Sequence, residues 1–452
     1  ERAGSPGLLQ VICPRWGKPF ALAGGFLLQF ILHLLLVVNC IVTWFNTIRQ
    51  EQKEQPALSL YLATNSTTMI RSALLKTATV FFFLCSFFLQ STAQSTNAEE
   101  CIKNIMQQTP VAGLSIAVVK NGKVIYTHSF GNKNIEANTP LTDDCLFRIA
   151  SISKSFSATS IMQLAEKKKL SLEDDISDLV GFKIRNPKFP ETAITLRMVM
   201  SHRSSINDKQ GYFTLNAINP DKNKDWAKCY NDYEPGTGYQ YCNLNYNMIG
   251  TIIEKKSGER FDQYVKHHIL DPLKLYGGYC VDSLDKSKFA TIYEYNDSLK
   301  KFTASPAAYA PRSEEIKNYT MGYSTPIFSP TGGMKISASD LAAYMIMHMN
   351  QGKYKGKKII SKESARQMQT KLSDKEGYGL ALLKTDKLIA GKTMTGHTGS
   401  AYGLYSAMFF NPEEKFGFIV ISNGCHPSYS DGFNTVIKKT VNCLFDNFIA
   451  IQ

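Results

Sequence analysis

A serine and a lysine three residues apart open an apolar helical stretch, FRIASISKSF, which runs from Phe147 to Phe156. A serine hydroxyl is a weak nucleophile until a neighbouring group takes its proton. Lysine takes that proton when burial or nearby positive charge destabilises its ammonium form. Side chains at i and i+3 share one helix face, so Ser151 and Lys154 have the spacing of a nucleophile and its base. In the first helical turn, Ser151 would also lie near the positive end of the helix dipole.

The S-x-x-K spacing alone is weak evidence, because it recurs at Ser283/Lys286 and at Ser298/Lys301. Those two copies fall in polar, loop-like stretches. The first copy opens an apolar helix, where an unpaired lysine would cost several kcal/mol. This setting distinguishes Ser151 and Lys154 from the other two pairs.

A second group of polar residues is Tyr241–Asn243, which forms the only Y-x-N sequence in the chain and leads into a predicted helix. A phenol and an amide that project together can relay a proton and hold a substrate amide or ester. Tyr241 and Asn243 are therefore candidates for the same site as Ser151.

A third group begins a predicted strand with His397, Thr398 and Gly399. A glycine in a strand lets the backbone come close to a ligand. The next backbone N–H, that of Ser400, would then join the N–H of Ser151 as an oxyanion hole.

Taken in order, S-x-x-K, Y-x-N and [K/H]-T-G resemble the motifs of the serine β-lactamase and penicillin-binding-protein superfamily. The chain is most similar to the class C β-lactamase branch, with its D-alanyl-D-alanine carboxypeptidase and esterase relatives. The likeness runs from about Pro110 to Phe445. Three further segments resemble that branch: ITLRMVMSHRSSI, PGTGYQYCNLNYNMIGTIIEKKSG and SPTGGMKISASDLAAYM.

The resemblance implies a role for each motif residue. Ser151 would be the acyl-accepting nucleophile and Lys154 its proton acceptor, while Tyr241 would shuttle protons to the leaving group and activate the deacylating water. The backbone amides of Ser151 and Ser400 would stabilise the oxyanion. No metal and no cofactor would be required. The residues that would bind substrate or line the site are Asn243, His397, Thr398, Gly399 and Ser400.

Departures from the family pattern bear on the substrate. The third motif of true class C β-lactamases opens with lysine, whereas this chain has His397, which is mostly neutral at pH 7. The expected substrate is therefore a small molecule or peptide with an amide, lactam or ester bond, with less support for penicillins. HRSS replaces the usual H-T-S-G, and we expect the Cys242 side chain to point away from the substrate.

Sequence patterns predict the elements that would position these residues. AGLSIAVVKNGKVIYTHSFG reads as a hairpin with its turn at Asn121-Gly122, and GHTGSAYGLYSAMFFNPEEKFGFIVISNG reads as strand, Asn-Pro turn, strand. Helical patterns lie between them, including two helices broken at Ser257-Gly258 and one with Ser339 or Asp340 near its N-cap. We expect an α/β (α+β) fold in which helices flank an antiparallel sheet from about 94–165 and 325–452, with an all-α domain inserted at about 166–324.

The N-terminal part differs from the rest. Residues 69–93 have the basic start, short apolar run and small-residue end of a signal peptide, which predicts a periplasmic or secreted bacterial protein. Phe20–Phe45 is apolar enough for a membrane anchor. The first methionine is Met69. We therefore interpret residues 1–68 as a non-native upstream extension, which arises if the start of the gene is assigned too early, with a genuine membrane anchor as the alternative.

Composition narrows the partners. The formal net charge is +13, but the basic residues are scattered and form no stripe with aromatics, so nucleic-acid binding has little support. We expect a monomer that meets the membrane only through the signal or the N-terminal anchor. Seven dispersed cysteines follow residue 94 without metal-ligand spacing, and one or two disulfides are compatible with an oxidising compartment.

Three functions fit these residues. The first is a serine hydrolase that forms an acyl-enzyme on Ser151. The second is an acyltransferase, in which an alcohol or amine takes the acyl group instead of water. The third is a non-catalytic sensor that binds β-lactams or peptidoglycan, against which the intact Ser151, Lys154 and Tyr241 argue.

Overall fold

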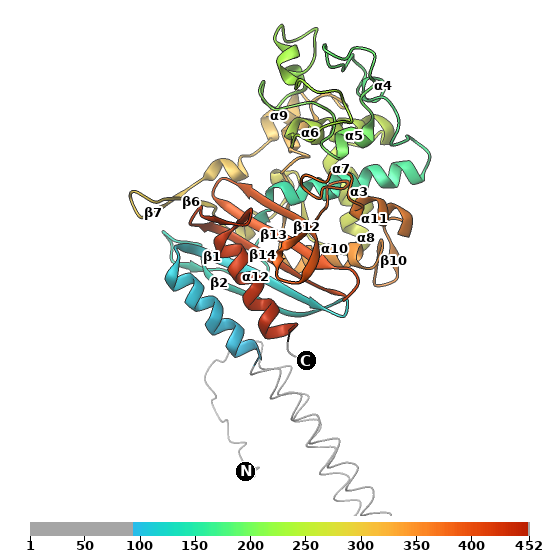
Figure 1. Ribbon diagram of the computed structural model, residues 1–452. Coiled ribbons are helices and arrows are strands. Elements are labelled where there is room, and N and C mark those ends of the chain that lie inside the picture. Colours follow the sequence, from blue (N-terminus) through green and yellow to red (C-terminus); the bar gives the residue numbers. More distant parts are fainter. Residues whose placement is uncertain (1–93, 451–452) are drawn as a thin grey trace, which may run out of the picture. The chain divides into compact units, whose positions relative to one another are not determined.

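The computed structural model describes residues 94–450, and its largest element is a seven-stranded antiparallel sheet in the order β11-β12-β13-β14-β1-β2-β3 (Figure 1). The predicted class, an antiparallel sheet flanked by helices, is confirmed. The strands are β1 (Val111–Lys120), β2 (Lys123–Asn134), β3 (Thr139–Pro140), β11 (Leu383–Ile389), β12 (Lys392–Ala401), β13 (Leu404–Asn411) and β14 (Phe416–Cys425).

The middle of the sheet joins the two ends of this part of the chain. β1 and β14 are nearly continuous apolar runs and are buried along almost their whole length, so they pair with each other at the centre, with Ile116 opposite Val420. The predicted hairpin between β1 and β2 is present. Asn121 and Gly122 both have positive φ, 53° and 68°, as a two-residue hairpin turn requires.

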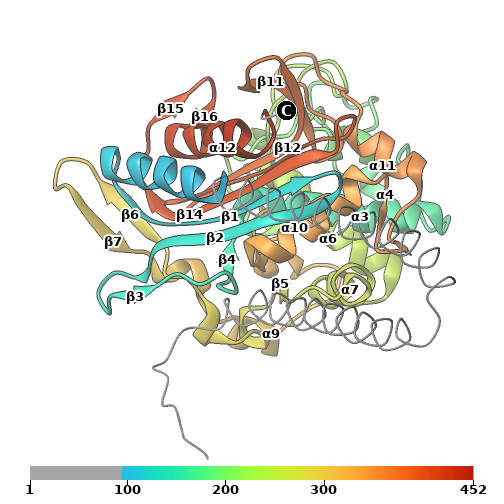
Figure 2. The ribbon, with the colours of Figure 1, turned by 90° about the horizontal axis from the view of Figure 1, so that it is seen from below.

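Helices cover both faces of the sheet. On one face, the helix at residues 94–108 packs beside α12 (Thr435–Phe448) (Figure 2). A disulfide between Cys101 and Cys443 links these two helices, a pairing that the sequence left open. On the other face lies α10 (Ala338–Met349), against which α3 (Ser153–Glu166) packs through the stacked rings of Phe156 and Tyr344.

A mainly helical region lies between α3 and α10 in the chain and stands above the sheet in the view of Figure 1. The predicted break at Gly258 is present, with a left-handed φ of 78° that ends α6. The helices are α4 (Ile176–Val180), α5 (Leu196–Met200), α6 (Asn243–Ser257), α7 (Phe261–Val265), α8 (Asp271–Leu273) and α9 (Ser313–Lys317). Helix α11 (Lys362–Gln369) follows α10. The remaining short strands of the described residues are β4 (Phe147–Arg148), β5 (Gly277–Gly278), β6 (Tyr293–Asn296), β7 (Lys301–Ala304), β8 (Lys335–Ile336), β9 (Lys353–Tyr354), β10 (Lys357–Lys358), β15 (Tyr429–Ser430) and β16 (Phe433–Asn434).

One local prediction was wrong. The first strand predicted in the C-terminal segment is two strands, because a tight turn at Tyr402 and Gly403, with φ of 58° and 87°, separates β12 from β13. Only the Asn-Pro turn that follows was predicted. The N-cap of α10 is Ser337, whose hydroxyl accepts from the Asp340 N–H, so Ser339 and Asp340 lie near the N-cap as predicted.

The predicted signal peptide at 69–93, the membrane segment and the upstream extension lie outside the described residues. Among residues 94–450, no helix combines the length and apolar character needed to cross a membrane.

Candidate active site

Ser151 lies in a short 3-10 turn, Ala150–Ile152, that leads directly into α3. Ser151 therefore lies just before the helix. The sequence had predicted that it would lie within the first turn of the helix. The preceding residue, Ala150, has a left-handed φ of 48°, an unfavourable conformation for a residue with a Cβ. Such strain is typical of functional sites, where the surrounding structure holds the backbone in place.

Lys154, in the first turn of α3, is completely buried, and its Nζ makes three polar contacts. Nζ lies 3.0 Å from Ser151 Oγ, 3.0 Å from Asn243 Oδ1 and 2.9 Å from the Thr331 carbonyl oxygen. A neutral amine has two N–H donors and one lone pair. With the donors directed to Asn243 and Thr331, the lone pair faces the Ser151 hydroxyl.

Burial lowers the pKa of Lys154 to about 7, although the nearby Asp208 carboxylate opposes this effect. A large fraction of the side chain is therefore neutral at physiological pH. An ordinary exposed lysine, with a pKa of about 10.4, would be almost entirely protonated. The site thus provides the destabilised ammonium that a lysine base requires.

Tyr241 brings its phenol to the same place. Its ring centroid lies 4.7 Å from Lys154 Nζ, and its hydroxyl is buried without a hydrogen bond of good geometry in residues 94–450. Burial raises the pKa of Tyr241, and the neighbouring Ser151 hydroxyl only partly offsets this rise. The phenol is therefore protonated at neutral pH and able to donate a proton.

Asn243 begins α6 and connects Lys154 to a residue that sequence reasoning missed, Asp208. The Asn243 Oδ1 accepts from Lys154 and from the Thr331 hydroxyl, while its Nδ2 donates to Asp208 at 3.0 Å. Asp208 also accepts the backbone N–H groups of Asn243 and Leu244, at 2.8 and 2.9 Å. It therefore caps α6 and fixes which side of the amide faces Lys154.

We expect Asp208→Asn to weaken both functions. An asparagine amide would place a donor against the N–H groups of α6, so the free energy of unfolding should fall by about 1–3 kcal/mol. The Asn243 amide would lose its orientation, and the rate at which a fluorophosphonate labels Ser151 should fall about tenfold. Chemical denaturation measures the first effect, and the labelling rate measures the second.

The matched control is Asp271→Asn, which breaks an exposed ion pair with Lys266. Its stability should stay within about 0.5 kcal/mol of wild type. Equal behaviour of the two variants would contradict the role assigned to Asp208.

The rings of His202 and Tyr241 pack against each other beside the site. The ring centroids are 4.3 Å apart, and His202 Nδ1 accepts the Cys242 N–H at 3.2 Å. Burial lowers the pKa of His202 well below its usual value, so the ring is neutral. The Cys242 thiol points to Asp208, with Sγ 3.1 Å from Oδ1.

Strand β12 brings the third motif to the opposite wall. β11 pairs with β12 only as far as Gly396, so from His397 to Ala401 the strand has β13 on one side and the site on the other. Gly399 is needed for this approach, since a Cβ there would lie 2.2 Å from the Ile149 carbonyl oxygen. The close contact brings Ser400 beside the turn that carries Ser151.

His397 is buried and bonded within the protein. Its Nε2 lies 3.1 Å from the Tyr378 hydroxyl, and its Nδ1 contacts the Thr398 carbonyl oxygen. Because a carbonyl only accepts, Nδ1 carries the proton and Nε2 accepts from Tyr378. Burial, followed by the nearby Lys154, lowers the pKa of His397 to about 3. His397 therefore provides neither a positive charge nor a free ring nitrogen to a ligand.

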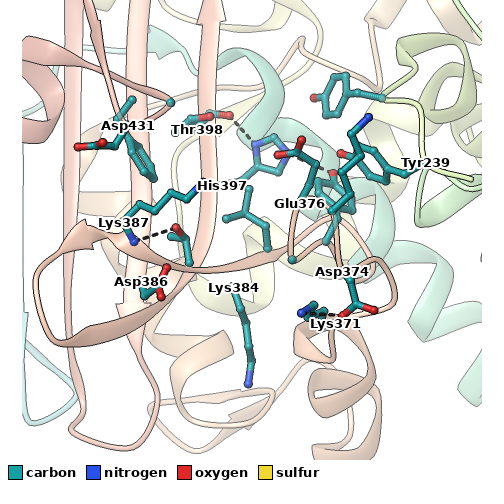
Figure 3. Close-up of a pocket in the computed structure, with 18 of the residues that line it drawn as sticks. Tyr239, Lys371, Asp374, Glu376, Lys384, Asp386, Lys387, His397, Thr398 and Asp431 are labelled. Carbon is teal, nitrogen blue, oxygen red and sulfur yellow. Dashed lines mark hydrogen bonds and ion pairs between the residues drawn. The ribbon is translucent and has the colours of Figure 1, made fainter.

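A cavity of about 840 Å³ is lined by Ser151 and Tyr241. His397 and Thr398 (Figure 3) line it together with Ser400, whereas Lys154, Asn243 and Gly399 are not among its lining residues. Much of the lining is polar or charged, and the ion pair between Lys371 and Asp374 lies at its edge. The other lining residues include Tyr239, Lys375, Glu376, Tyr378, Leu383, Lys384, Thr385, Asp386, Lys387, Thr393, Asp431 and Phe433.

This sheet, with its helical region and a serine–lysine pair between them, defines a protein of the β-lactamase and penicillin-binding-protein fold. The beta-lactamase family profile matches residues 98–440. The chain therefore belongs to the beta-lactamase family.

Similar proteins include "Protein flp" of Staphylococcus aureus strain MW2, which is 23% identical over 339 residues, 71% of this chain and 61% of that protein. The chain thus spans less than two thirds of that relative. "Putative penicillin-binding protein PbpX" of Bacillus subtilis strain 168 is 30% identical over 250 residues, 54% of this chain and 58% of that protein.

Solved structures agree on the fold. The octameric penicillin-binding protein homologue from Pyrococcus abyssi has a TM-score of 0.61 at 28% identity, covering 77% of this chain and 76% of its own. The D-amino acid amidase of Ochrobactrum anthropi SV3 has a TM-score of 0.60 at 18% identity, covering 78% of this chain and 98% of its own. At that identity the likeness concerns the fold alone.

Proposed function

We propose that this protein is a serine hydrolase that forms an acyl-enzyme on Ser151. The observation that carries the proposal is the position of the Lys154 amine, which is fully buried and 3.0 Å from the Ser151 hydroxyl. Burial keeps much of this amine neutral, and it is held by two acceptors that leave its lone pair facing the hydroxyl. These are the requirements for activating a serine with a lysine.

Acylation follows from this arrangement. Lys154 takes the Ser151 proton as Oγ attacks the substrate carbonyl, and the backbone N–H groups of Ser151 and Ser400 stabilise the oxyanion. Tyr241 donates its proton to the leaving group, and the Lys154 ammonium returns a proton to Tyr241. The leaving group departs protonated and Lys154 is neutral again.

Deacylation uses the same residues. Water attacks the acyl carbonyl and gives its proton to the neutral Lys154, either directly or through the Tyr241 phenol, which passes its own proton on. The Lys154 ammonium then protonates Ser151 Oγ as the ester bond breaks, so the acid is released and both side chains return to their starting forms. The raised pKa of Tyr241 favours its action as a donor and relay, and makes it a poor first base. Asn243 holds the amine in place through its Oδ1.

The cavity favours a polar substrate with an amide or ester bond. Its volume of about 840 Å³ suits a peptide-sized molecule, and its charged rim does not suit a long acyl chain. Because His397 offers no cation, the case for β-lactams with a fixed carboxylate is weaker than for peptides, amides and esters. The structural neighbours titled a D-amino acid amidase and a penicillin-binding protein homologue are consistent with this class.

Acyl transfer is the second candidate. The cavity has room for an acceptor alcohol or amine beside the acyl group, and a neighbour with a TM-score of 0.61 and 17% identity is titled "EstCE1, a hydrolase with promiscuous acyltransferase activity". The same acyl-enzyme serves both reactions, and the difference lies in which nucleophile arrives.

Covalent labelling tests the proposal. The protein is incubated with a fluorescent penicillin and with a fluorophosphonate, with Ser151→Ala as the control, and the labelled residue is found by mass. Labelling of Ser151 by both probes supports a β-lactam-reactive hydrolase, and labelling by the phosphonate alone supports an esterase or transferase. No label from either probe would favour the non-catalytic sensor. Product analysis with and without an added alcohol then separates hydrolysis from transfer.

The rate of labelling should depend on pH in a particular way. Because only the neutral amine accepts the Ser151 proton and the pKa of Lys154 is about 7, the fluorophosphonate rate should rise about tenfold per pH unit below pH 7 and level off above it. Rates measured from pH 5 to 9 check this. A rate that continued to rise through pH 9 would indicate an unperturbed lysine and contradict the assignment.

We also propose a secreted or periplasmic location and a monomer. The disulfide between Cys101 and Cys443 is consistent with an oxidising compartment. Fractionation of the native host and light scattering of the purified protein test the two statements.

A further inference from the structure

Arg148 is a buried cation three residues before Ser151, and the described part of the chain places no counter-ion beside it. The residue is only 8% exposed, and its side chain makes no ion pair within residues 94–450. Its partners are neutral: the carbonyl oxygens of Gly332 and Ala308, at 2.9 and 3.4 Å, and Ser329 Oγ at 3.3 Å. The ring of Tyr402 lies 5.0 Å from its guanidinium carbon. Burying an unpaired guanidinium is costly, so its retention calls for a function.

The function concerns the loop at residues 329–333. Three successive carbonyl oxygens of this loop accept from three side chains around the nucleophile: Pro330 from Ser157 Oγ, Thr331 from Lys154 Nζ and Gly332 from Arg148 Nε, each at 2.9 Å. The loop therefore holds the amine of Lys154 from one side. Arg148 also reaches Ser329, so its planar fork bridges both ends of the segment that carries the Thr331 carbonyl.

We infer that Arg148 is a positioning residue: by holding the carbonyl of Gly332 and the hydroxyl of Ser329, it keeps the Thr331 carbonyl against Lys154 and the lone pair of that amine directed at Ser151. Arg148 itself does not touch the reacting atoms. The inference rests on the proposed function, since it assigns Lys154 as the base.

Lys335 supplies a matched control. It lies opposite Arg148 in the pairing of β4 with β8, is also buried, and donates to the Tyr279 carbonyl oxygen at 2.5 Å. It has no bond to the loop at 329–333 among its described contacts. Replacing either cation disturbs the same neighbourhood, but of the two only Arg148 bonds the loop whose Thr331 carbonyl holds Lys154.

The fluorophosphonate labelling rate rises with pH below about pH 7, and this part of the profile, the acidic limb, reports the pKa of Lys154. A carbonyl acceptor stabilises the ammonium more than the amine, so loss of the Thr331 contact should lower the pKa of Lys154. Neither substituted residue is among the titratable groups that surround this amine, which are Asp208, Cys242, His202, His397, Tyr241 and Tyr246. The groups that set the profile therefore stay in place in both variants.

The experiment compares wild type, Arg148→Gln, Arg148→Lys and Lys335→Met in fluorophosphonate labelling from pH 5 to 9. For Arg148→Gln we expect the maximal rate kinact to fall about tenfold, the half-saturating probe concentration to stay within about twofold, and the acidic limb to move to lower pH. Arg148→Lys retains a cation without the planar fork, so its kinact should fall less. It also provides a folded variant if glutamine is not tolerated. Lys335→Met should keep the wild-type limb and kinact.

A labelled wild type with unchanged kinact in both Arg148 variants would overturn this inference alone. So would a fall in kinact with an unmoved acidic limb, or the same changes in Lys335→Met. A wild-type protein that is not labelled at Ser151 would overturn the proposed function, and this inference with it.

Discussion

Replacement of Lys154 by methionine should slow acylation of Ser151 by about 10²–10⁴-fold, the range for removal of a positioned general base. Methionine fills a similar volume but cannot accept a proton, and no other neutral base contacts Ser151 Oγ in the described site. The rate of fluorophosphonate labelling at pH 8, where wild-type Lys154 is mostly neutral, measures the loss.

The exposed Lys167, at the other end of α3, is the control for this variant. Lys167→Met should label at the wild-type rate. A Lys154→Met protein that acylated within about tenfold of wild type would show that some other group activates the serine.

The same variant should change the pH dependence of stability. The pKa of Lys154 is lowered to about 7 in the folded protein and is about 10.4 in an unfolded chain, so the unfolded chain binds the extra proton between these values. The free energy of unfolding of wild type should therefore rise between pH 7 and 10 by up to about 1.4 kcal/mol per unit from this residue. In Lys154→Met this contribution should be absent. Denaturant unfolding at pH 7 and 9 gives the difference.

Tyr241→Phe should reduce turnover of amide and ester substrates by about 10²-fold, because it removes the proton donor while keeping the ring that packs over Lys154. The loss should be larger for a substrate with a poor leaving group, such as an anilide, than for a nitrophenyl ester. The comparison of the two substrates reports donation to the leaving group and not a general disturbance of the site.

Tyr239→Phe is the control for this second variant, since Tyr239 lines the same cavity but is not next to Ser151 and Lys154. It should keep the wild-type ratio of anilide to ester turnover. Equal losses on both substrates in Tyr241→Phe would argue that the phenol orients the site without donating a proton.

Local spacing predicted the core of the site. The i, i+3 spacing together with its apolar, helical setting distinguished Ser151 and Lys154 from the other two pairs, and the structure brings Tyr241, Asn243 and β12 to them from distant parts of the chain. The antiparallel sheet and the break at Gly258 were also visible, since alternation and glycine placement are local signals.

The support around Lys154 had no such signal. Asp208, Thr331 and Arg148 contact the site through bonds that span tens to hundreds of residues, and two of the contacts use backbone carbonyls, which carry no side-chain identity. In the sequence, Asp208 looked like any loop aspartate, because it lies 35 residues before Asn243, the first residue of the helix that it caps. A mostly neutral His397 was predicted from its usual pKa, but nothing in the sequence indicated that the Tyr378 hydroxyl would bond its ring nitrogen.

The bond between Cys101 and Cys443 determines when the protein can be completed during biosynthesis. Because Cys443 follows Cys101 by 342 positions and lies in the helix after the last strand, its thiol leaves the ribosome only after every strand of the sheet has been made. Oxidation before that point can only pair Cys101 with a wrong partner, such as one of the five cysteines that stay free and buried within residues 94–450. A host for recombinant production therefore needs both an oxidising environment and an isomerase, and in reduced chains from a cytosolic preparation the helix at residues 94–108 should be held by packing alone.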